Sequence, residues 1–138
     1  ACTLLEATPA DGLPPVFDQR NLSLADASLN ALTALDVLPR LRAPTGAIAR
    51  IHISRAGDFG RVLLEAADYG RAAFGRVVLA RDFGDALEAR LRTLPGLTRL
   101  RPARFLGLAA DDAPGEGLRR VRVDGDDGER VLSARLLV

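Results

Sequence analysis

The stretch Cys2 to Arg20, CTLLEATPADGLPPVFDQR, decides how the rest of the chain is interpreted. It begins with a short apolar run, Thr3 to Leu5, whose lack of polar alternation predicts a strand covered on both faces in a parallel sheet. Glu6 follows this run and is therefore expected at the carboxyl end of the strand. Residues 8–15 contain several prolines and a glycine, which argue against a helix or a central strand and predict a long connection.

An acid at the end of such a strand has two interpretations. In dinucleotide-binding folds, an acidic side chain at the end of the second strand accepts hydrogen bonds from a cofactor ribose. The alternative is that Glu6 is an ordinary solvated residue at a strand boundary. The chain has no G-x-G-x-x-G motif, so a ribose acid here implies that the phosphate-binding turn lies outside these 138 residues. Together with the absence of Met, this favours an internal piece of a larger protein.

The composition is that of a globular domain rather than a disordered or membrane-spanning chain, with 48% hydrophobic and 27% charged residues. All 19 basic residues are Arg, and they are scattered among 18 acids, so no nucleic-acid partner is expected. Cys2 is the single cysteine and His52 the single histidine, so there is no internal disulfide and no metal-ligand spacing. These features, and the lack of a signal peptide or of an apolar run of about 18 residues, favour a cytoplasmic protein.

Two segments with helical spacing are expected to cover a core. Ser23 to Asp26 resembles a capping box with Asp in place of Glu, and the apolar residues after it predict a helix over 24–37. A strand over 75–79 is expected to lead into a second helix over 82–94, with Asp82 as its cap.

Alternating side chains in residues 48–54, a glycine-rich turn and the apolar run 62–64 predict a β-hairpin. His52 falls on the polar face of its strand. We expect it to be a surface or interface residue rather than a catalytic base, because no orienting partner is evident.

The final third predicts short strands and a β-meander joined by turns rich in Gly and Asp. The expected strands are 97–100, 104–109, 118–123 and 129–135. Residues 136–138 form an apolar run that stops abruptly, as expected for a buried strand that is cut short.

Two arginines are candidate ligand contacts. Arg20 closes a D-x-R sequence, and its guanidinium is suited to a phosphate or a planar ring, although a local Asp18–Arg20 salt bridge is the alternative. Arg81 lies immediately before the expected cap of the second helix, where a solvated side chain is the alternative.

Five segments, in order along nearly the whole chain, resemble the aromatic-ring flavin hydroxylases, most of all the ubiquinone-biosynthesis branch of the 2-polyprenyl-6-methoxyphenol hydroxylase type. The segments are LLEA at 4–7, FDQRNLSLADASLNAL at 17–32, RIHISRAGDFG at 50–60, FGRVVLARDFGDAL at 74–87 and DGERVLSARLLV at 127–138. The resemblance implies an α/β chain with a partial FAD/NAD(P)-binding (Rossmann-like) fold, a β-meander and part of a β-rich substrate domain. Residues 1–45 and 75–138 would belong to the FAD-binding domain, and 46–74 to the sheet that covers the substrate.

The resemblance also implies an activity, an FAD-dependent monooxygenase that hydroxylates a phenolic ubiquinone precursor with NAD(P)H and dioxygen. Carried over by position, Glu6 matches the ribose-binding acid, Arg20 the arginine against the flavin, and Arg81 an arginine that lines the cofactor. No catalytic residue is assigned. At 77–81 the chain reads VVLAR where the family often has V-V-E-N-R, so only part of that motif is present.

Further expectations follow from the resemblance. The family's glycine turn would precede Ala1 and its later flavin motifs would follow Val138, so this chain is expected to bind FAD poorly and not to turn over. The partner is an aromatic small molecule. Self-association, contact with ubiquinone-pathway proteins and a position at the periphery of the inner membrane stay open. The alternatives are a flavin hydroxylase for another aromatic substrate and a non-catalytic module that interacts through its β-rich face.

Overall fold

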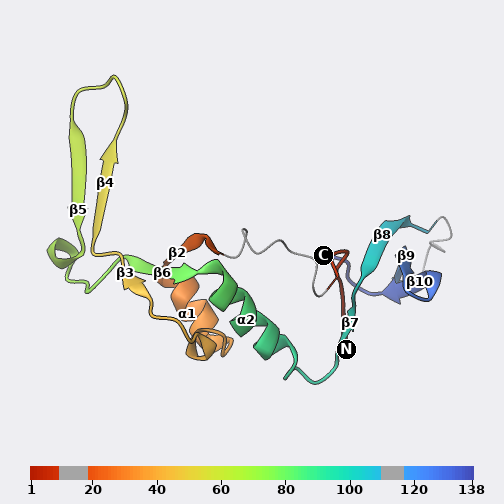
Figure 1. Cartoon of the computed structure of the whole chain (residues 1–138). Coiled ribbons are helices and arrows are strands. Elements are labelled where there is room, and N and C mark those ends of the chain that lie inside the picture. Colours follow the sequence, from red (N-terminus) through yellow and green to blue (C-terminus); the bar gives the residue numbers. More distant parts are fainter. Residues whose placement is uncertain (10–18, 110–116) are drawn as a thin grey trace. The chain divides into compact units, whose positions relative to one another are not determined.

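The structure, a computed structural model, describes residues 1–9, 19–109 and 117–138. In this part of the chain it is a mixed α/β structure with two α-helices and several small sheets (Figure 1). The chain divides into two compact units: unit 1 comprises Ala1–Leu13 and Pro95–Val138, and unit 2 comprises Pro14–Leu94. The assignment of segments to a cofactor domain and a substrate domain stays a prediction.

Unit 1 contains the expected first strand in a parallel pair. Strand β1 (Cys2–Leu5) pairs with β7 (Leu97–Leu100), Cys2 opposite Leu97. The parallel pairing agrees with the sequence, but the expected burial on both faces is wrong. Residues 2–4 are exposed, and only Leu5 of this strand packs on the core. The reason is that β7 is the only strand that pairs with β1 among the described residues.

The other strands of unit 1 form the expected meander. Its three antiparallel strands are β8 (Ala103–Leu108), β9 (Arg119–Gly125) and β10 (Gly128–Ala134), in the order β10-β9-β8. Val121 and Val123 point inward at alternate positions of β9 and form a core with Ala103. Leu5, Leu100 and Leu132 pack against this core, so β1, β7 and the meander share it.

The expectation of a buried strand at 136–138 is wrong. Strand β10 ends at Ala134, and Leu136, Leu137 and Val138 are exposed at 76%, 44% and 113%. These residues have no neighbouring strand among the described residues, so an apolar run alone does not form a sheet here. The turn expected at 111–117 lies almost wholly outside the described residues.

Unit 2 is built on a three-stranded sheet whose central strand is β6 (Gly75–Leu79). Strands β2 (Asn21–Ala25) and β3 (Gly46–Ala47) pair with it in antiparallel orientation. Helices α1 (Asp26–Ala34) and α2 (Ala80–Leu91) lie on the same side of this sheet (Figure 1). The buried apolar side chains here include Leu29, Val37, Val78 and Ala86.

The expected helix over 24–37 is shorter and starts later than the sequence indicates. Ser23 lies in β2 opposite Val77, so it is not a helix cap, and no side chain caps α1. The alternation of Leu22, Ser23 and Leu24 explains the difference, because pairing with β6 outweighs the local capping pattern. After α1, a short 3₁₀ helix, η2 (Leu38–Arg40), follows.

Helix α2 begins at Ala80 and ends at Leu91, so the predicted range 82–94 is displaced. Asp82 lies in the first turn and does not cap the helix. Its carboxylate instead accepts hydrogen bonds from the backbone N–H of Arg42 (3.1 Å to each oxygen) and of Ala43 (3.0 Å). Asp82 therefore ties the segment after η2 to α2.

The predicted hairpin is present as β4 (Arg50–Ser54) and β5 (Arg61–Glu65), followed by a 3₁₀ turn, η3 (Ala66–Tyr69). Ile51 faces Leu64 and Ile53 faces Val62, so one face of this ribbon is apolar. His52 is exposed on the other face, as expected.

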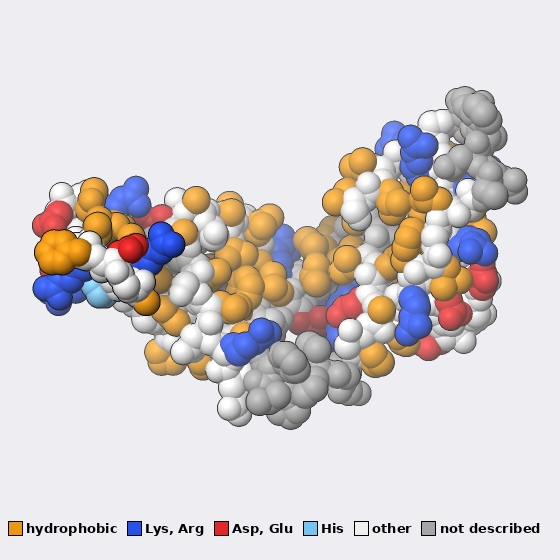
Figure 2. Space-filling model, turned by 90° about the horizontal axis from the view of Figure 1, so that it is seen from above, with side chains coloured by type: hydrophobic (Ala, Val, Ile, Leu, Met, Phe, Trp, Pro, Cys, Tyr) orange, Lys and Arg blue, Asp and Glu red, His pale blue; other side chains and the backbone are white. Residues whose placement is uncertain are grey.

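Much of the apolar surface of the hairpin faces solvent. Ile53 is 54% exposed, Val62 52%, and Phe59 in the turn is fully exposed. Hydrophobic side chains accordingly lie among charged ones on the hairpin, at the left of Figure 2. No helix in the described ranges combines the length and the apolar character that crossing a membrane requires.

Candidate functional site

Glu6 lies at the carboxyl end of β1, where the sequence placed it. Its backbone N–H donates to the carbonyl of Leu100 at 3.1 Å, and its own carbonyl accepts from the N–H of Ala103 at 2.8 Å. The backbone of Glu6 is thus held between the end of β7 and the start of β8. This fixes the direction in which the side chain leaves the sheet.

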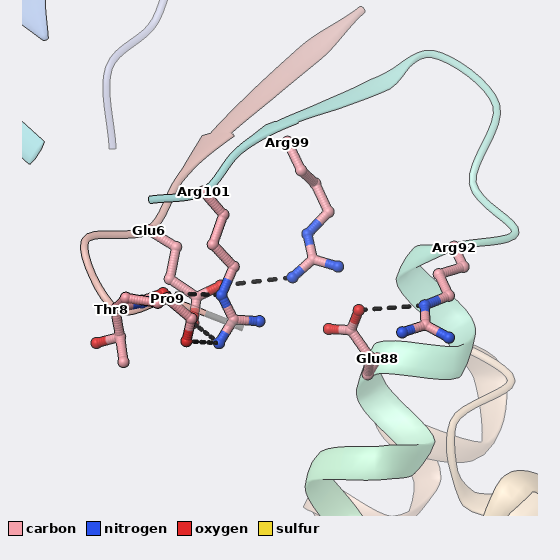
Figure 3. A network of polar contacts seen from close by, with 7 residues as sticks. All are labelled: Glu6, Thr8, Pro9, Glu88, Arg92, Arg99 and Arg101. Carbon is pink, nitrogen blue, oxygen red and sulfur yellow. Dashed lines mark hydrogen bonds and ion pairs between the residues drawn. The ribbon is translucent and has the colours of Figure 1, made fainter. Parts of the chain in front are cut away.

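Two guanidinium groups converge on the Glu6 carboxylate (Figure 3). Arg101 Nη2 lies 3.1 Å from Oε1, and Arg99 Nη2 lies 3.4 Å from Oε2. The Glu6 side chain is 37% exposed, against 22% for Arg99 and 18% for Arg101. Because the arginine side chains are mostly shielded from water, this network orders the carboxylate more than an isolated surface ion pair would.

The hydrogen-bond acceptor positions that remain on the Glu6 carboxylate determine which groups it can bind. An ionised carboxylate is an acceptor only, with about four lone-pair sites on its two oxygens. Within the part of the chain that the structure describes, one guanidinium nitrogen contacts each oxygen, which leaves acceptor positions for further donors, and the side chain is partly open to solvent. Glu6 is therefore suited to accept hydrogen bonds from hydroxyl groups while the arginines hold it in place.

Arg101 also orders the chain that follows Glu6. Its Nε donates to the carbonyl of Thr8 at 2.8 Å, and its Nη2 donates to the carbonyl of Pro9 at 3.1 Å. A single side chain at the end of β7 thus holds both the acid and the start of the connection after it (Figure 3).

Arg99 and Arg101 were not identified from the sequence. The signal was present, because an R-x-R sequence spans the end of a strand that was expected at 97–100. The carboxyl ends of two parallel strands meet at the same edge of a sheet, so pairing β7 with β1 places these arginines beside Glu6. That pairing, between segments more than ninety residues apart, was not predicted.

Arg20 and Arg81 both lie in unit 2, and a backbone hydrogen bond links the two segments that carry them. Arg20 immediately precedes β2, and its carbonyl accepts a hydrogen bond of 2.8 Å from the N–H of Ala80, the first residue of α2. Arg81 is the next residue along α2, and both arginines are exposed. The structure thus places them at one edge, where β2 and α2 begin.

The alternative interpretation of Arg20 involves Asp18, which lies outside the described residues. Glu6 belongs to unit 1, whereas Arg20 and Arg81 belong to unit 2. Assignment of these three residues to cofactor binding stays a prediction. Within the described ranges, no group of three or more His, Cys, Asp and Glu side chains is arranged to hold a metal ion.

Comparison with known proteins gives the class of fold. No family model matches the chain. Solved structures match it over nearly its whole length, among them BexE, from a study of oxidation during BE-7585A biosynthesis, with a TM-score of 0.68 and 21% identity over 98% of this chain. CabE, an aromatic hydroxylase from angucycline biosynthesis, matches over 96% with a TM-score of 0.66 and 21% identity.

A third match is p-nitrophenol 4-monooxygenase PnpA from Pseudomonas putida DLL-E4, with a TM-score of 0.60 and 16% identity over 96% of this chain. The chain spans 25%, 24% and 32% of the lengths of BexE, CabE and PnpA. Its fold is therefore that of a segment of aromatic-hydroxylase and monooxygenase structures.

Proposed function

We propose that this chain is part of an FAD-dependent monooxygenase that hydroxylates a phenolic ring with NAD(P)H and dioxygen. The observation that carries the proposal is the fold, which CabE, an aromatic hydroxylase, and PnpA, a p-nitrophenol monooxygenase, share over 96% of the chain. The sequence resemblance to the aromatic-ring flavin hydroxylases supports it independently. FAD would supply the redox chemistry, namely hydride acceptance and reaction with dioxygen.

Glu6 fits the ribose of FAD. It ends a strand of a parallel pair, has spare acceptor positions and is partly exposed. In this role Arg99 and Arg101 orient the carboxylate as an acceptor for ribose hydroxyls. They are positioning residues, and they do not themselves need to touch the cofactor.

Arg20 and Arg81 fit a planar or anionic part of the same cofactor. Their shared edge supplies two exposed guanidinium groups, which bind phosphate oxygens through paired N–H donors or stack on flat rings. A Rossmann-like FAD-binding domain that contains Glu6, Arg20 and Arg81 is part of this proposal. The chain's own residues would thus bind and orient FAD.

The expected substrate is a phenolic ubiquinone precursor. Its support is the resemblance of the five segments to the ubiquinone-biosynthesis branch. The names of the structural neighbours point to other aromatic substrates, because CabE is described as an aromatic hydroxylase from angucycline biosynthesis and PnpA is named for p-nitrophenol. A flavin hydroxylase for another aromatic substrate is accordingly the alternative. If the substrate is a ubiquinone precursor, we also propose a cytoplasmic location, with contacts to ubiquinone-pathway proteins or to the periphery of the membrane.

The test is to express the complete open reading frame that encodes this chain and to purify its product. We expect a protein that retains FAD and oxidises NAD(P)H faster when a phenol is present. With heavy-isotope dioxygen, one oxygen atom of the product ring should carry the label. Polyprenyl phenols, simple nitrophenols and polycyclic phenols should be compared as substrates. A product without flavin, or one whose NAD(P)H oxidation ignores every phenol, would contradict the proposal.

Glu6 provides the residue-level arm of this test. Glu6→Gln keeps the shape but weakens the acceptor and the ion pairs with Arg99 and Arg101, so FAD affinity should fall by about tenfold or more. The matched control is Glu129→Gln, which changes an exposed acid of β10 that forms an ion pair with exposed Arg122. Equal FAD affinity for both variants would show that Glu6 does not contact the cofactor.

A second candidate function is a non-catalytic interaction module. The observation that favours it is the β4–β5 hairpin, with an apolar face, a fully exposed Phe59 and no further strand paired to it among the described residues. In that case the open-reading-frame product would lack flavin but would self-associate or bind a protein partner. Replacing Ile53 and Val62 by Thr would then abolish the association.

A further inference from the structure

A hollow in unit 2 has no part in the proposed function. It lies where α1 begins beside the segment that leads into β6, and its volume is about 310 Å³. Its lining residues are Asp26, Leu29, Arg71, Ala72, Ala73, Gly75 and Arg76. None of the proposed cofactor residues is among them.

The charges around this hollow do not cancel. Arg71 Nη1 lies 2.8 Å from Asp26 Oδ2, so these two residues form an ion pair. Arg76 Nη1 donates to Thr45 Oγ1 at 2.8 Å, and no carboxylate in the described part of the chain pairs with Arg76. The two arginines and one aspartate therefore leave one positive charge at the hollow.

The two guanidinium groups differ in how they are held. Asp26 is the first residue of α1, and its ion pair with Arg71 lies in the lining of the hollow. Thr45 occupies only one terminal nitrogen of Arg76. A guanidinium has five N–H donors in a fixed fork, so Arg76 keeps donors for a planar, two-oxygen acceptor.

The rest of the lining is small and apolar. Leu29 is buried, and Ala72 and Ala73 provide methyl groups and backbone. Gly75 has no side chain, and a Cβ atom there would lie 2.1 Å from the carbonyl oxygen of Leu24. A ligand that fits therefore needs a short apolar body beside its charged group.

We propose that this hollow binds a small organic carboxylate. Arg76 would bind its two oxygens, Arg71 would add a second positive charge, and the apolar body would lie on Leu29, Ala72 and Ala73. The Asp26 carboxylate makes the site unfavourable for a dianion, since the single excess positive charge matches a monoanion. Phosphate should therefore bind more weakly than a carboxylate of similar size.

The test is an NMR titration of the 138-residue chain with isobutyrate as the probe. We expect saturable shifts at the backbone amides of Ala72, Ala73 and Gly75. Isobutyramide, which has the same shape without the charge, and inorganic phosphate should bind at least about tenfold more weakly. Arg76→Gln should weaken isobutyrate binding by about tenfold or more, since a charge-assisted pair is lost.

The matched control is Arg61→Gln on the exposed edge of the β4–β5 hairpin, which should bind isobutyrate like the unchanged chain. Three results would overturn the proposal. They are the absence of saturable shifts at the amides of Ala72, Ala73 and Gly75, equal affinity for isobutyrate and isobutyramide, and an equal loss of isobutyrate affinity in Arg76→Gln and Arg61→Gln. The probe comparison needs no variant, so it decides the question even if Arg76→Gln fails to fold. Failure here leaves the flavin proposal untouched, because that proposal rests on other residues.

Discussion

At the scale of single residues, the network around Glu6 shows what sequence reasoning finds and what it misses. The position of Glu6 at the end of a parallel strand follows from an apolar run and the acid after it. Its partners do not follow, because Arg99 and Arg101 are brought to it by the pairing of β1 with β7. Local pattern predicts where a strand ends, whereas long-range pairing decides which side chains meet there.

Replacing Arg101 should destabilise unit 1, because its contacts to the first residues of the chain are lost. Arg101→Met keeps much of the aliphatic stem but loses the contacts to Glu6, Thr8 and Pro9, which should lower the free energy of unfolding by about 1–3 kcal/mol. Urea unfolding measures this change. Arg104→Met, at an exposed position of β8, is the control and should change stability by less than about 0.5 kcal/mol. Equal changes in stability for Arg101→Met and Arg104→Met would mean that the contacts of Arg101 do not stabilise the fold.

Glycines offer a second residue-level prediction. A Cβ at Gly75 would lie 2.1 Å from the backbone oxygen of Leu24, an atom that cannot move without shifting β2. Gly75→Ala should therefore destabilise unit 2 by about 1–3 kcal/mol. Gly84, within α2, has open space around it, so Gly84→Ala should stabilise by about 0.5–1 kcal/mol. Thermal unfolding of both variants should give shifts of opposite sign; a shift in the same direction contradicts the packing described here.

At the scale of elements, the alternation of apolar and polar residues predicted the strands better than capping patterns predicted where the helices begin. The hairpin, the strand at 75–79 and the meander follow from period-two patterns and turn residues. Both helices start elsewhere than their apparent caps indicate. Ser23 is part of β2 because its neighbours Leu22 and Leu24 pair with β6. Burial was also mispredicted for β1 and for 136–138, because it depends on which strands lie alongside.

Asp82 gives the prediction that belongs to this scale. It is an anchor between α2 and the segment after η2, so Asp82→Ala leaves the N–H groups of Arg42 and Ala43 without their acceptor. The expected loss in the free energy of unfolding is about 1–3 kcal/mol. Asp85→Ala, at an exposed position of the same helix, is the control and should be close to neutral. Hydrogen exchange at Arg42 and Ala43 should accelerate only in the Asp82 variant; unchanged exchange would contradict this anchoring role.

At the scale of the whole molecule, the chain has the fold of a segment of aromatic-hydroxylase structures and spans about a quarter of the lengths of BexE and CabE. The order of the five resembling segments predicted this fold. The division into the two units was not predicted, since it depends on pairing residues 2–5 with residues 97–100.

The 138-residue chain on its own should bind FAD weakly and should not oxidise NADPH. It contains no G-x-G-x-x-G, and that motif is what lets backbone N–H groups approach the pyrophosphate. A fluorescence titration with FAD should not saturate, and addition of NADPH should give no flavin-dependent oxidation. Tight, stoichiometric binding accompanied by turnover would show that the residues of this chain suffice.

The hairpin has a practical consequence for anyone who handles the chain. A two-stranded ribbon is only marginally stable in water by itself, and this one carries Ile51, Ile53, Val62 and Leu64 along one side. No further strand of the described residues pairs with β4 or β5, so each outer edge also offers backbone donors and acceptors in a row, which is the arrangement that recruits another strand. Concentrated solutions should therefore grow intermolecular sheets from β4 and β5, and a dye that responds to such sheets would reveal them first.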